Sequence, residues 1–216
     1  MANANVGMMY PVFAPLNTHT DGSMPTYGTG VVIEEARTAT VTREYQNNPL
    51  YGDDRIVDDD NGMVGLTISF ESTGLTDAER KTLFGEEDYG TSGVSGQWVS
   101  DNETPYGGFG YIRKMRNAGT VTYEAWITLK IKFQEESQTT TTKEGTITWG
   151  TPTLNGRAAS LDVDGSGKLR FQLHKTFSGT SALANAKAYI NAMLNVSTTE
   201  CKRGPDGESG PHSFYK

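Results

Sequence analysis

Hydrophobic and polar side chains alternate most regularly between residues 121 and 133. Every second residue there is apolar, from Val121 through Ile127 to Phe133, and the residues between them are polar except Trp126. Successive side chains of a β-strand point to opposite faces, so the pattern predicts a strand with one buried face. Such a strand would span roughly 40 Å at about 3.3 Å per residue, which is typical of barrels and tubes. Residues 63–71 alternate in the same way.

Other strands are predicted where β-branched and aromatic residues lie between turns that contain glycine or proline. The segment 31–44 is ambiguous between helix and strand, and its β-branched residues favour a strand. The remaining predicted strands cover residues 8–14, 94–99, 106–115, 146–149, 154–163 and 168–173.

Two helices are predicted among these strands. Thr76 and Glu79 have the spacing of a capping box, and Gly85 follows at a position that ends a helix. Residues 181–195 place apolar side chains on one helical stripe. Its members are Leu183, Ala186, Ile190, Met193 and Leu194. We therefore expect a mainly β protein with one short flanking helix and a C-terminal helix.

Residues 45–62 form a polar segment that predicts a long loop. Its five aspartates are Asp53, Asp54, Asp58, Asp59 and Asp60, and its apolar residues include Leu50, Tyr51, Ile56 and Val57. A solvated loop is the commonest meaning of such a run, docking on a basic partner surface is the second, and cation binding is a third. Loops of this length inside compact domains are usually functional or lack order when free.

The domain organisation is simple. We expect one domain over residues 1–197, because no repeat or boundary interrupts it, and a polar C-terminal arm or tail over residues 198–216. The single cysteine, Cys201, excludes an internal disulfide. The first residues carry no basic segment and no run approaches about 20 apolar residues, so we expect neither a secretory signal nor a membrane span.

The net charge of −7 argues against a protein that reads nucleic-acid sequence, since such a protein normally has a basic face. Two motifs resemble binding sites only in part. The segment 162–167 resembles the start of a calcium loop, but Leu173 stands where a bidentate Glu is required, so a β-turn is favoured. The segment 108–112 resembles an RNA-recognition strand, yet Gly107 and Lys114 break that pattern and favour core or sheet-surface aromatics.

Catalysis has little support in the sequence. His19, His174 and His212 have no nucleophile or carboxylate arranged beside them, although scattered carboxylates leave a glycosidase-like pair open. We therefore expect a non-enzymatic protein that needs no cofactor and no metal.

The order of the features resembles the major tail protein (tail tube protein) family of siphovirus-like phages of Gram-positive bacteria. The resemblance covers about residues 8–195, and the ordered set is specific although no single motif is. The matching segments are LYGDD at 50–54, GLTISF at 65–70, GLTDAE at 74–79, LFG at 83–85, TPYGGFGY at 104–111, LKIKF at 129–133 and WGTPTLNG at 149–156.

This resemblance implies a tail-tube-type β-sandwich or half-barrel of two antiparallel sheets. It also implies that six subunits close into a ring, that rings stack into a hollow tube in the virion tail, and that assembly takes place in the host cytoplasm. The implied partners are other copies of the chain, the tape measure protein, the tail terminator and distal tail proteins, and double-stranded DNA that passes through the lumen without sequence-specific binding. The family has no catalytic residues to carry over.

Three hypotheses follow from the tube interpretation. The lumen is net acidic, which would let DNA slide because phosphates find no cationic holding points. The tail 198–216 packs on a neighbouring subunit. Residues 47–62 make the ring-to-ring contact, with Tyr51 as the main anchor, and become ordered on assembly. The alternatives are a virion-associated carbohydrate-binding or adhesive β-sandwich module and, third, an enzyme.

Overall fold

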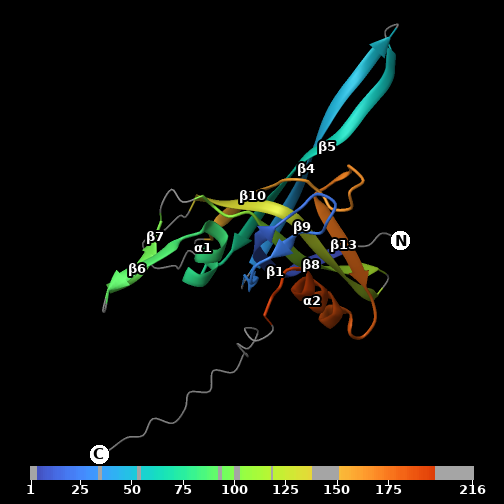
Figure 1. The fold of residues 1–216 in the computed structure, drawn as a ribbon. Helices are drawn as coiled ribbons and strands as arrows, with labels where there is room; N and C mark the ends of the chain where they lie inside the picture. The colour runs from blue at the N-terminus through green and yellow to red at the C-terminus, as the bar shows by residue number, and fades with distance from the viewer. Residues whose placement is uncertain are drawn as a thin grey trace, which may run out of the picture.

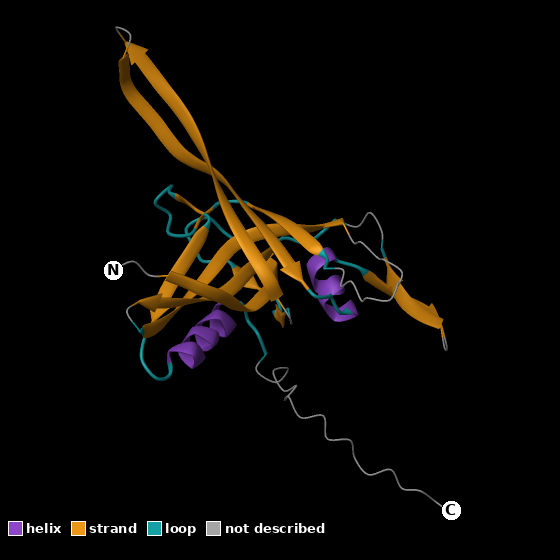
Figure 2. Ribbon diagram, turned by 180° about the vertical axis from the view of Figure 1, so that it is seen from behind, coloured by secondary structure: helices purple, strands orange, loops and turns teal. Residues whose placement is uncertain are grey.

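The computed structural model describes residues 4–33, 36–52, 55–91, 94–99, 103–117, 119–137 and 151–197. The described part of the protein is mainly β, with large antiparallel pairings and two helices (Figures 1 and 2). The mainly β class predicted from the alternation patterns is therefore confirmed. No helix of the described ranges is long and apolar enough to cross a membrane.

Nine of the described strands form one antiparallel sheet. Its main path runs β2-β1-β8-β9-β10-β5-β4, with β3 beside β1 and β13 beside β9. The bounds are β1 (Ala4–Thr18), β2 (Thr26–Tyr27), β3 (Val31–Val32), β4 (Ala36–Gly52), β5 (Arg55–Ser72), β8 (Gly107–Asn117), β9 (Thr120–Ser137), β10 (Thr153–Ala158) and β13 (Gln172–Phe177). Two small ribbons stand apart: β6 (Glu87–Thr91) with β7 (Val94–Trp98), and β11 (Leu161–Asp162) with β12 (Leu169–Arg170).

The two separate sheets expected from the resemblance are not seen, because nine of the described strands form one sheet, which folds into two layers at β9. The first half of β9 pairs with β8 on one edge and with β13 on the other, whereas residues 131–137 pair with β10. A strand of 18 residues is long enough to belong to both layers, which is why the layers stay hydrogen-bonded to each other.

A β-bulge in β9 changes which of its faces points inward. Gly107 pairs with Ile131 and Phe109 pairs with Thr128, so β9 has two residues where β8 has one. Ahead of the bulge, Ile127 packs beneath the C-terminal helix, while Ile131 after it packs between the layers. The unbroken alternation seen in the sequence therefore supplies two different cores.

The core between the layers is aromatic. Phe13, Phe109 and Phe133 are fully buried, and their rings meet edge to face with centroids 5.1 and 5.9 Å from that of Phe133. Phe70 of β5 approaches Phe109 in the same way at 5.7 Å. Edge-to-face pairs add to the stabilisation from buried area, so this cluster fixes how the layers pack.

The short helix α1 (Asp77–Phe84) begins and ends where the sequence predicts. The Thr76 amide donates to Glu79 Oε2 at 2.6 Å, the Glu79 amide donates to Thr76 Oγ1 at 3.4 Å, and Gly85 has a left-handed φ of 72°. Arg80 ties the helix to β9, because its Nη2 lies 2.9 Å from both Glu86 Oε1 and Glu135 Oε2.

The second helix, α2 (Ala182–Met193), packs on the outer face of β8 and β9. Glycines in β8 allow this close approach, since a Cβ atom at Gly108 would lie 2.6 Å from a Leu194 methyl carbon. Phe109 and Tyr111, on the opposite face, are buried in the core between the layers. They are core aromatics, as the sequence favours, and are not exposed for stacking on bases.

Candidate functional site

The main candidate site is a β-hairpin that extends from the body on the side opposite α2 (Figures 1 and 2). Strands β4 and β5 stay paired from Ala36 and Ser72 out to Gly52 and Arg55. Strand β10 pairs with β5 only from Glu71 to Leu66, so the hairpin continues beyond Gly65 as a ribbon of two strands. We call residues 45–64 of this hairpin the hairpin arm.

The prediction of a long loop at residues 45–62 was wrong for the backbone. Asn47 pairs with Asn61 and Leu50 pairs with Asp58, so both sides of the segment are strands. The antiparallel ladder started in the core continues outward, and each strand satisfies backbone groups of the other. A polar ribbon gives no hydrophobic alternation, which is why the sequence pattern did not reveal it. Pro49 fits, since proline is tolerated on an edge strand.

The structure brings most of the predicted contact residues onto the two strands of the hairpin arm. Leu50 and Tyr51 belong to β4, and Ile56, Val57, Asp58, Asp59 and Asp60 belong to β5. Asp53 and Asp54 lie outside the described residues, as do the predicted strand 146–149 and the tail 198–216.

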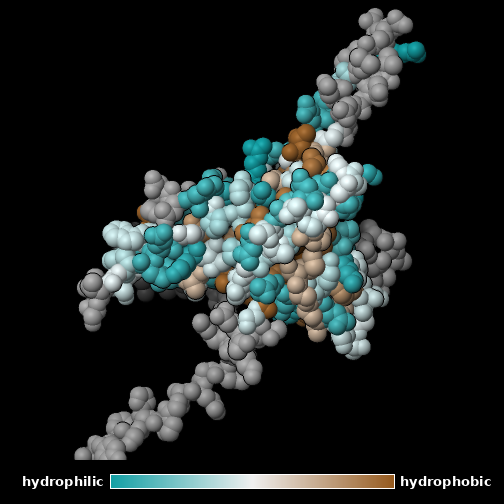
Figure 3. Space-filling model, in the orientation of Figure 1, coloured by the Kyte–Doolittle hydropathy of each residue, from teal (hydrophilic) through white to brown (hydrophobic). Residues whose placement is uncertain are grey.

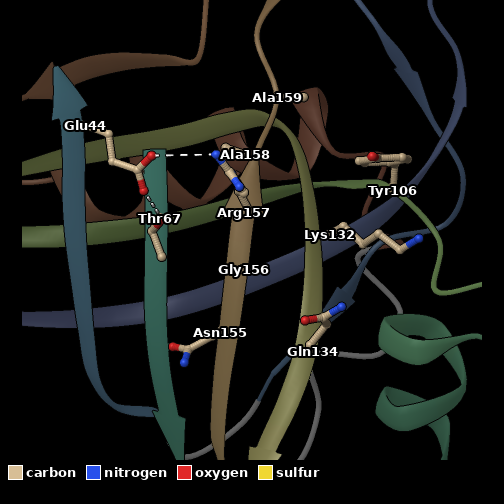
Figure 4. Close-up of a pocket in the computed structure, with 10 residues that line it drawn as sticks. All are labelled: Glu44, Thr67, Tyr106, Lys132, Gln134, Asn155, Gly156, Arg157, Ala158 and Ala159. Atoms are coloured by element: carbon tan, nitrogen blue, oxygen red, sulfur yellow. Dashed lines mark hydrogen bonds and ion pairs between the residues drawn. The ribbon is translucent and has the colours of Figure 1, made fainter. Parts of the chain in front are cut away.

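The base of the hairpin arm is cross-linked on the outer face of the sheet (Figure 4). Glu44 Oε1 accepts a hydrogen bond of 3.0 Å from the Thr67 hydroxyl, and Glu44 Oε2 lies 3.8 Å from Arg157 Nη2. Gly65 makes this possible, because a Cβ atom there would lie 2.5 Å from Glu44 Oε2. Three strands, β4, β5 and β10, are thus linked where the two-stranded ribbon begins.

The same outer face forms a broad polar depression of about 760 Å³. Hydroxyl, amide and basic side chains line it, among them Lys132, Gln134 and Asn155. The Tyr106 ring lies at its rim, with Lys130 Nζ 4.6 Å and Lys132 Nζ 5.4 Å from the ring centroid. Such a surface can make many weak polar contacts.

An apolar patch marks the point where the hairpin arm leaves the body, and most of the remaining surface visible in the same view is polar (Figure 3). Val64 and Tyr45 are both more than half exposed at this point. Exposed apolar residues that gather beside a projecting element are typical of a contact surface.

The segment 162–167 is the β-turn that the sequence favours. It connects β11 with β12, and the Asp162 carboxylate accepts amide hydrogen bonds from Gly165 at 2.9 Å and Gly167 at 3.0 Å. Hydrogen bonds from the Ser166 hydroxyl and amide, together with Arg170, lower the pKa of Asp164 to about 2. Both carboxylates are therefore engaged by the turn itself.

A cationic cavity around Trp126 was missed by the sequence reasoning. Arg43 Cζ lies 5.9 Å and Arg113 Cζ 5.5 Å from the indole centroid, and the His174 ring stacks on it at 4.5 Å. A cavity of about 310 Å³ opens between β4 and the strands β1 and β8 at this point. Trp126, as the one aromatic on an otherwise polar strand face, was the available signal.

The β6–β7 ribbon carries a second exposed feature. The Tyr89 and Trp98 rings pack with centroids 4.6 Å apart, and Trp98 is 57% exposed. Gln97 donates to the Asp77 carbonyl at 2.9 Å, and Lys81 pairs with Asp88, so the ribbon is fastened to α1.

No protein-family model matches the chain, and no curated protein matches it either.

Proposed function

We propose that this protein is the structural subunit of a phage tail tube, in which rings of six copies stack into a hollow conduit for the tape measure protein and then for DNA. The observation that carries the proposal is the hairpin arm, a long antiparallel ribbon that projects from a two-layered β body. The ordered resemblance to the tail tube family gives the same interpretation from the sequence.

Open strand edges support self-association. Strand β4 is the last strand on the sheet path, so one of its edges has no neighbour among the described strands. An open edge of this length is a ready template for pairing with another chain. Identical subunits that meet head to tail form closed rings or continuing filaments, and a ring stack combines both arrangements.

The hairpin arm supports contact between rings. Strand β10 stops pairing with β5 at Leu66, which lies opposite Arg43 of β4. Beyond that point β4 extends from Glu44 to Gly52, about 27 Å at roughly 3.3 Å per residue. A two-stranded ribbon has marginal stability in water by itself, so a long one is best explained by a partner that covers it. The ring-to-ring role predicted for residues 47–62 is retained, with strands in place of the loop.

The polar depression on β5, β9 and β10 suits the surface of a conduit. It carries both signs of charge, because Glu44, Lys132 and Arg157 line it and Lys130 lies at its rim beside Tyr106. A balanced polar face would hold passing DNA weakly. The net acidic lumen then depends on residues elsewhere in the ring and stays a prediction.

Assembly of the full chain tests the proposal. The wild-type protein should form rings or tubes, seen by electron microscopy and light scattering at high concentration and with tail initiator proteins added. A matched variant replaces residues 47–61 by an Asn-Gly turn between Gln46 and Gly62, a dipeptide that suits tight hairpins. It should remain folded and fail to stack. A wild-type protein that stays monomeric under all these conditions would refute the tube role.

A carbohydrate-binding or adhesive module is the second candidate, favoured by the exposed Tyr89 and Trp98 rings. Aromatic rings on a projecting ribbon can pack against the apolar face of a sugar. Glycan binding by the monomer, lost in Trp98→Ala and unchanged in Tyr106→Ala, would favour this function. Tube formation without glycan binding would exclude it.

A further inference from the structure

The cavity beside Trp126 contains two arginines without anionic partners. Within the described ranges neither Arg43 nor Arg113 forms an ion pair, and each guanidinium lies over the indole ring instead. Glu124 is opposite Arg113 in the sheet register, but its Oε2 accepts the Trp126 indole N–H at 3.0 Å. The local charge is therefore positive.

Several elements hold this arrangement in place. Arg43 comes from β4, Arg113 from β8, Trp126 from β9 and His174 from β13. Burial raises the pKa of Tyr111 on the cavity wall, and the charges of Arg113 and Arg43 oppose that rise. Planar guanidiniums that already stack on an aromatic ring keep their N–H groups free for carboxylates.

The chain offers one concentrated source of carboxylates, the five aspartates between residues 53 and 60. Three of them, Asp58, Asp59 and Asp60, lie on β5 within the hairpin arm, and Arg43 lies on β4 just before the arm begins. Their partners on β4, from Asn48 to Leu50, are about 17–23 Å along the strand from Arg43. A paired ribbon cannot fold back over that distance, so these three aspartates cannot reach the cavity of their own chain.

We infer that the Trp126 cavity, flanked by Arg43 and Arg113, receives the aspartate-rich end of the hairpin arm from a second copy of this chain. The inference rests on the proposed head-to-tail assembly and adds the receiving surface to it. Successive copies would be offset along the arm by about the distance from Arg43 to the described aspartates, roughly 20 Å. Because donor and acceptor are different surfaces of one chain, the contact repeats in one direction and gives the stack a polarity.

Electrostatic complementarity would govern the rate and register of this contact more than its strength. Each exposed ion pair contributes only about 0.2–1 kcal/mol, so a single arm would hold weakly. Several arms per ring would engage together, and the stack could then be firm while isolated chains stay apart.

A mixing experiment with two complementary variants tests the inference. The tip variant carries Asp→Asn at positions 53, 54, 58, 59 and 60 and keeps its cavity. The cavity variant, Arg43→Gln with Arg113→Gln, keeps its arm. Neither should associate through this contact alone, but the mixture should form pairs in sedimentation velocity. The pairing should weaken as NaCl is raised from about 0.05 to about 0.5 M, because salt screens charges.

Matched controls separate charge from place. Lys168→Gln with Arg170→Gln removes the same charge at exposed positions away from the cavity, so this variant should still associate by itself as the wild type does. If either variant has lost its structure by circular dichroism, charge reversal replaces it: Arg43→Glu with Arg113→Glu should block stacking, and Asp→Lys at positions 58–60 in the same chain should restore it.

The outcomes distinguish this contact from the tube proposal. Pairing of the complementary variants without tubes in the wild type would uphold the contact and refute the tube. Tubes formed normally by each single variant would refute the contact and uphold the tube. Binding of a short DNA duplex that is lost in the cavity variant, without pairing in the mixture, would assign the cavity to nucleic acid and overturn the inference.

Discussion

The two halves of the β4–β5 hairpin differ in the contacts that stabilise them. In the inner half, Leu66, Ile68 and Phe70 are fully buried and β10 pairs alongside β5. In the hairpin arm the same two strands continue without a third strand, and the side chains where it begins, at Tyr45 and Val64, are more than half exposed. The backbone ladder passes from one half to the other through a β-bulge at Val64, since Glu44 pairs with Gly65 and Tyr45 pairs with Met63.

This contrast suggests that different parts of the hairpin determine the stability of the subunit and its association with other copies. Ordering the chain costs about 1–2 kcal/mol of conformational entropy for each backbone residue, and no third described strand pairs with the hairpin arm to offset that cost. The body should therefore set the free energy of unfolding, and the hairpin arm should set how copies meet. Substitutions in the body should therefore change stability more than substitutions in the hairpin arm.

Phe70→Ala should destabilise the protein most. It removes a fully buried ring that contacts Phe109, and large-to-small changes of this kind typically cost about 3–5 kcal/mol. Denaturant unfolding followed by circular dichroism measures the loss. Val64→Ala, only a few residues away on the same strand, is the matched control and should cost under about 1 kcal/mol. Similar losses for both variants would remove the distinction between the two halves.

Arg80→Met should cost about 2–3 kcal/mol, because it leaves Glu86 and Glu135 partly buried without their cation. The same unfolding measurement applies. Adding Glu86→Gln to Arg80→Met should recover part of the loss, since one uncompensated charge is then removed. If Arg80→Met alone is neutral, the Arg80 cluster does not fasten α1 to the body.

Tyr27→Phe should cost about 1–2 kcal/mol at neutral pH. The Tyr27 hydroxyl donates a 2.7 Å hydrogen bond to the Leu129 carbonyl at the β9 bulge, and the variant leaves that carbonyl without it.

Burial also raises the pKa of Tyr27, so its stabilisation is fully present below the unfolded pKa of about 10 and is lost as the pH rises above it. The difference in unfolding free energy between wild type and Tyr27→Phe should therefore narrow in alkaline solution. A difference that stays constant through that range would contradict the assigned role of the buried hydroxyl.

Tyr51→Ala should leave the free energy of unfolding unchanged within about 0.5 kcal/mol and should reduce assembly. Hydrogen exchange supplies the second measurement. In free subunits the amides of residues 47–62 should exchange faster than those of residues 66–71, and assembly should slow the first group only. Normal tubes from Tyr51→Ala, or equal protection of residues 47–62 before and after assembly, would rule out this segment as the ring-to-ring contact.

Local signals in the sequence predicted the local structure well. The Thr76 and Glu79 capping box and Gly85 define α1 because cap hydrogen bonds form within a few residues. The long strand at 121–133 and the helix beneath β8 were predicted by periodicity, since each element buries one face.

The features that position the candidate site depend on contacts between distant residues. The bulge at Leu129 leaves the alternation of β9 intact and shows only in its register with β8, while its carbonyl is satisfied by Tyr27. The cavity needs side chains from four strands to meet around Trp126. Contacts between strands that are distant in the sequence leave no periodic pattern along any one strand, so the cavity could not be predicted from the sequence.

The antiparallel pairing of the hairpin determines how it would bear a mechanical load. A pull on its outer end tensions both strands along their covalent backbones, and the hydrogen bonds between them, which lie perpendicular to the strands, are not sheared against each other. The load reaches the body where β10 begins to pair with β5. The six residue pairs between these two strands then act at the same time against sliding of β5 past β10. Under tension the ribbon itself should stay intact, and failure should begin where β5 parts from β10.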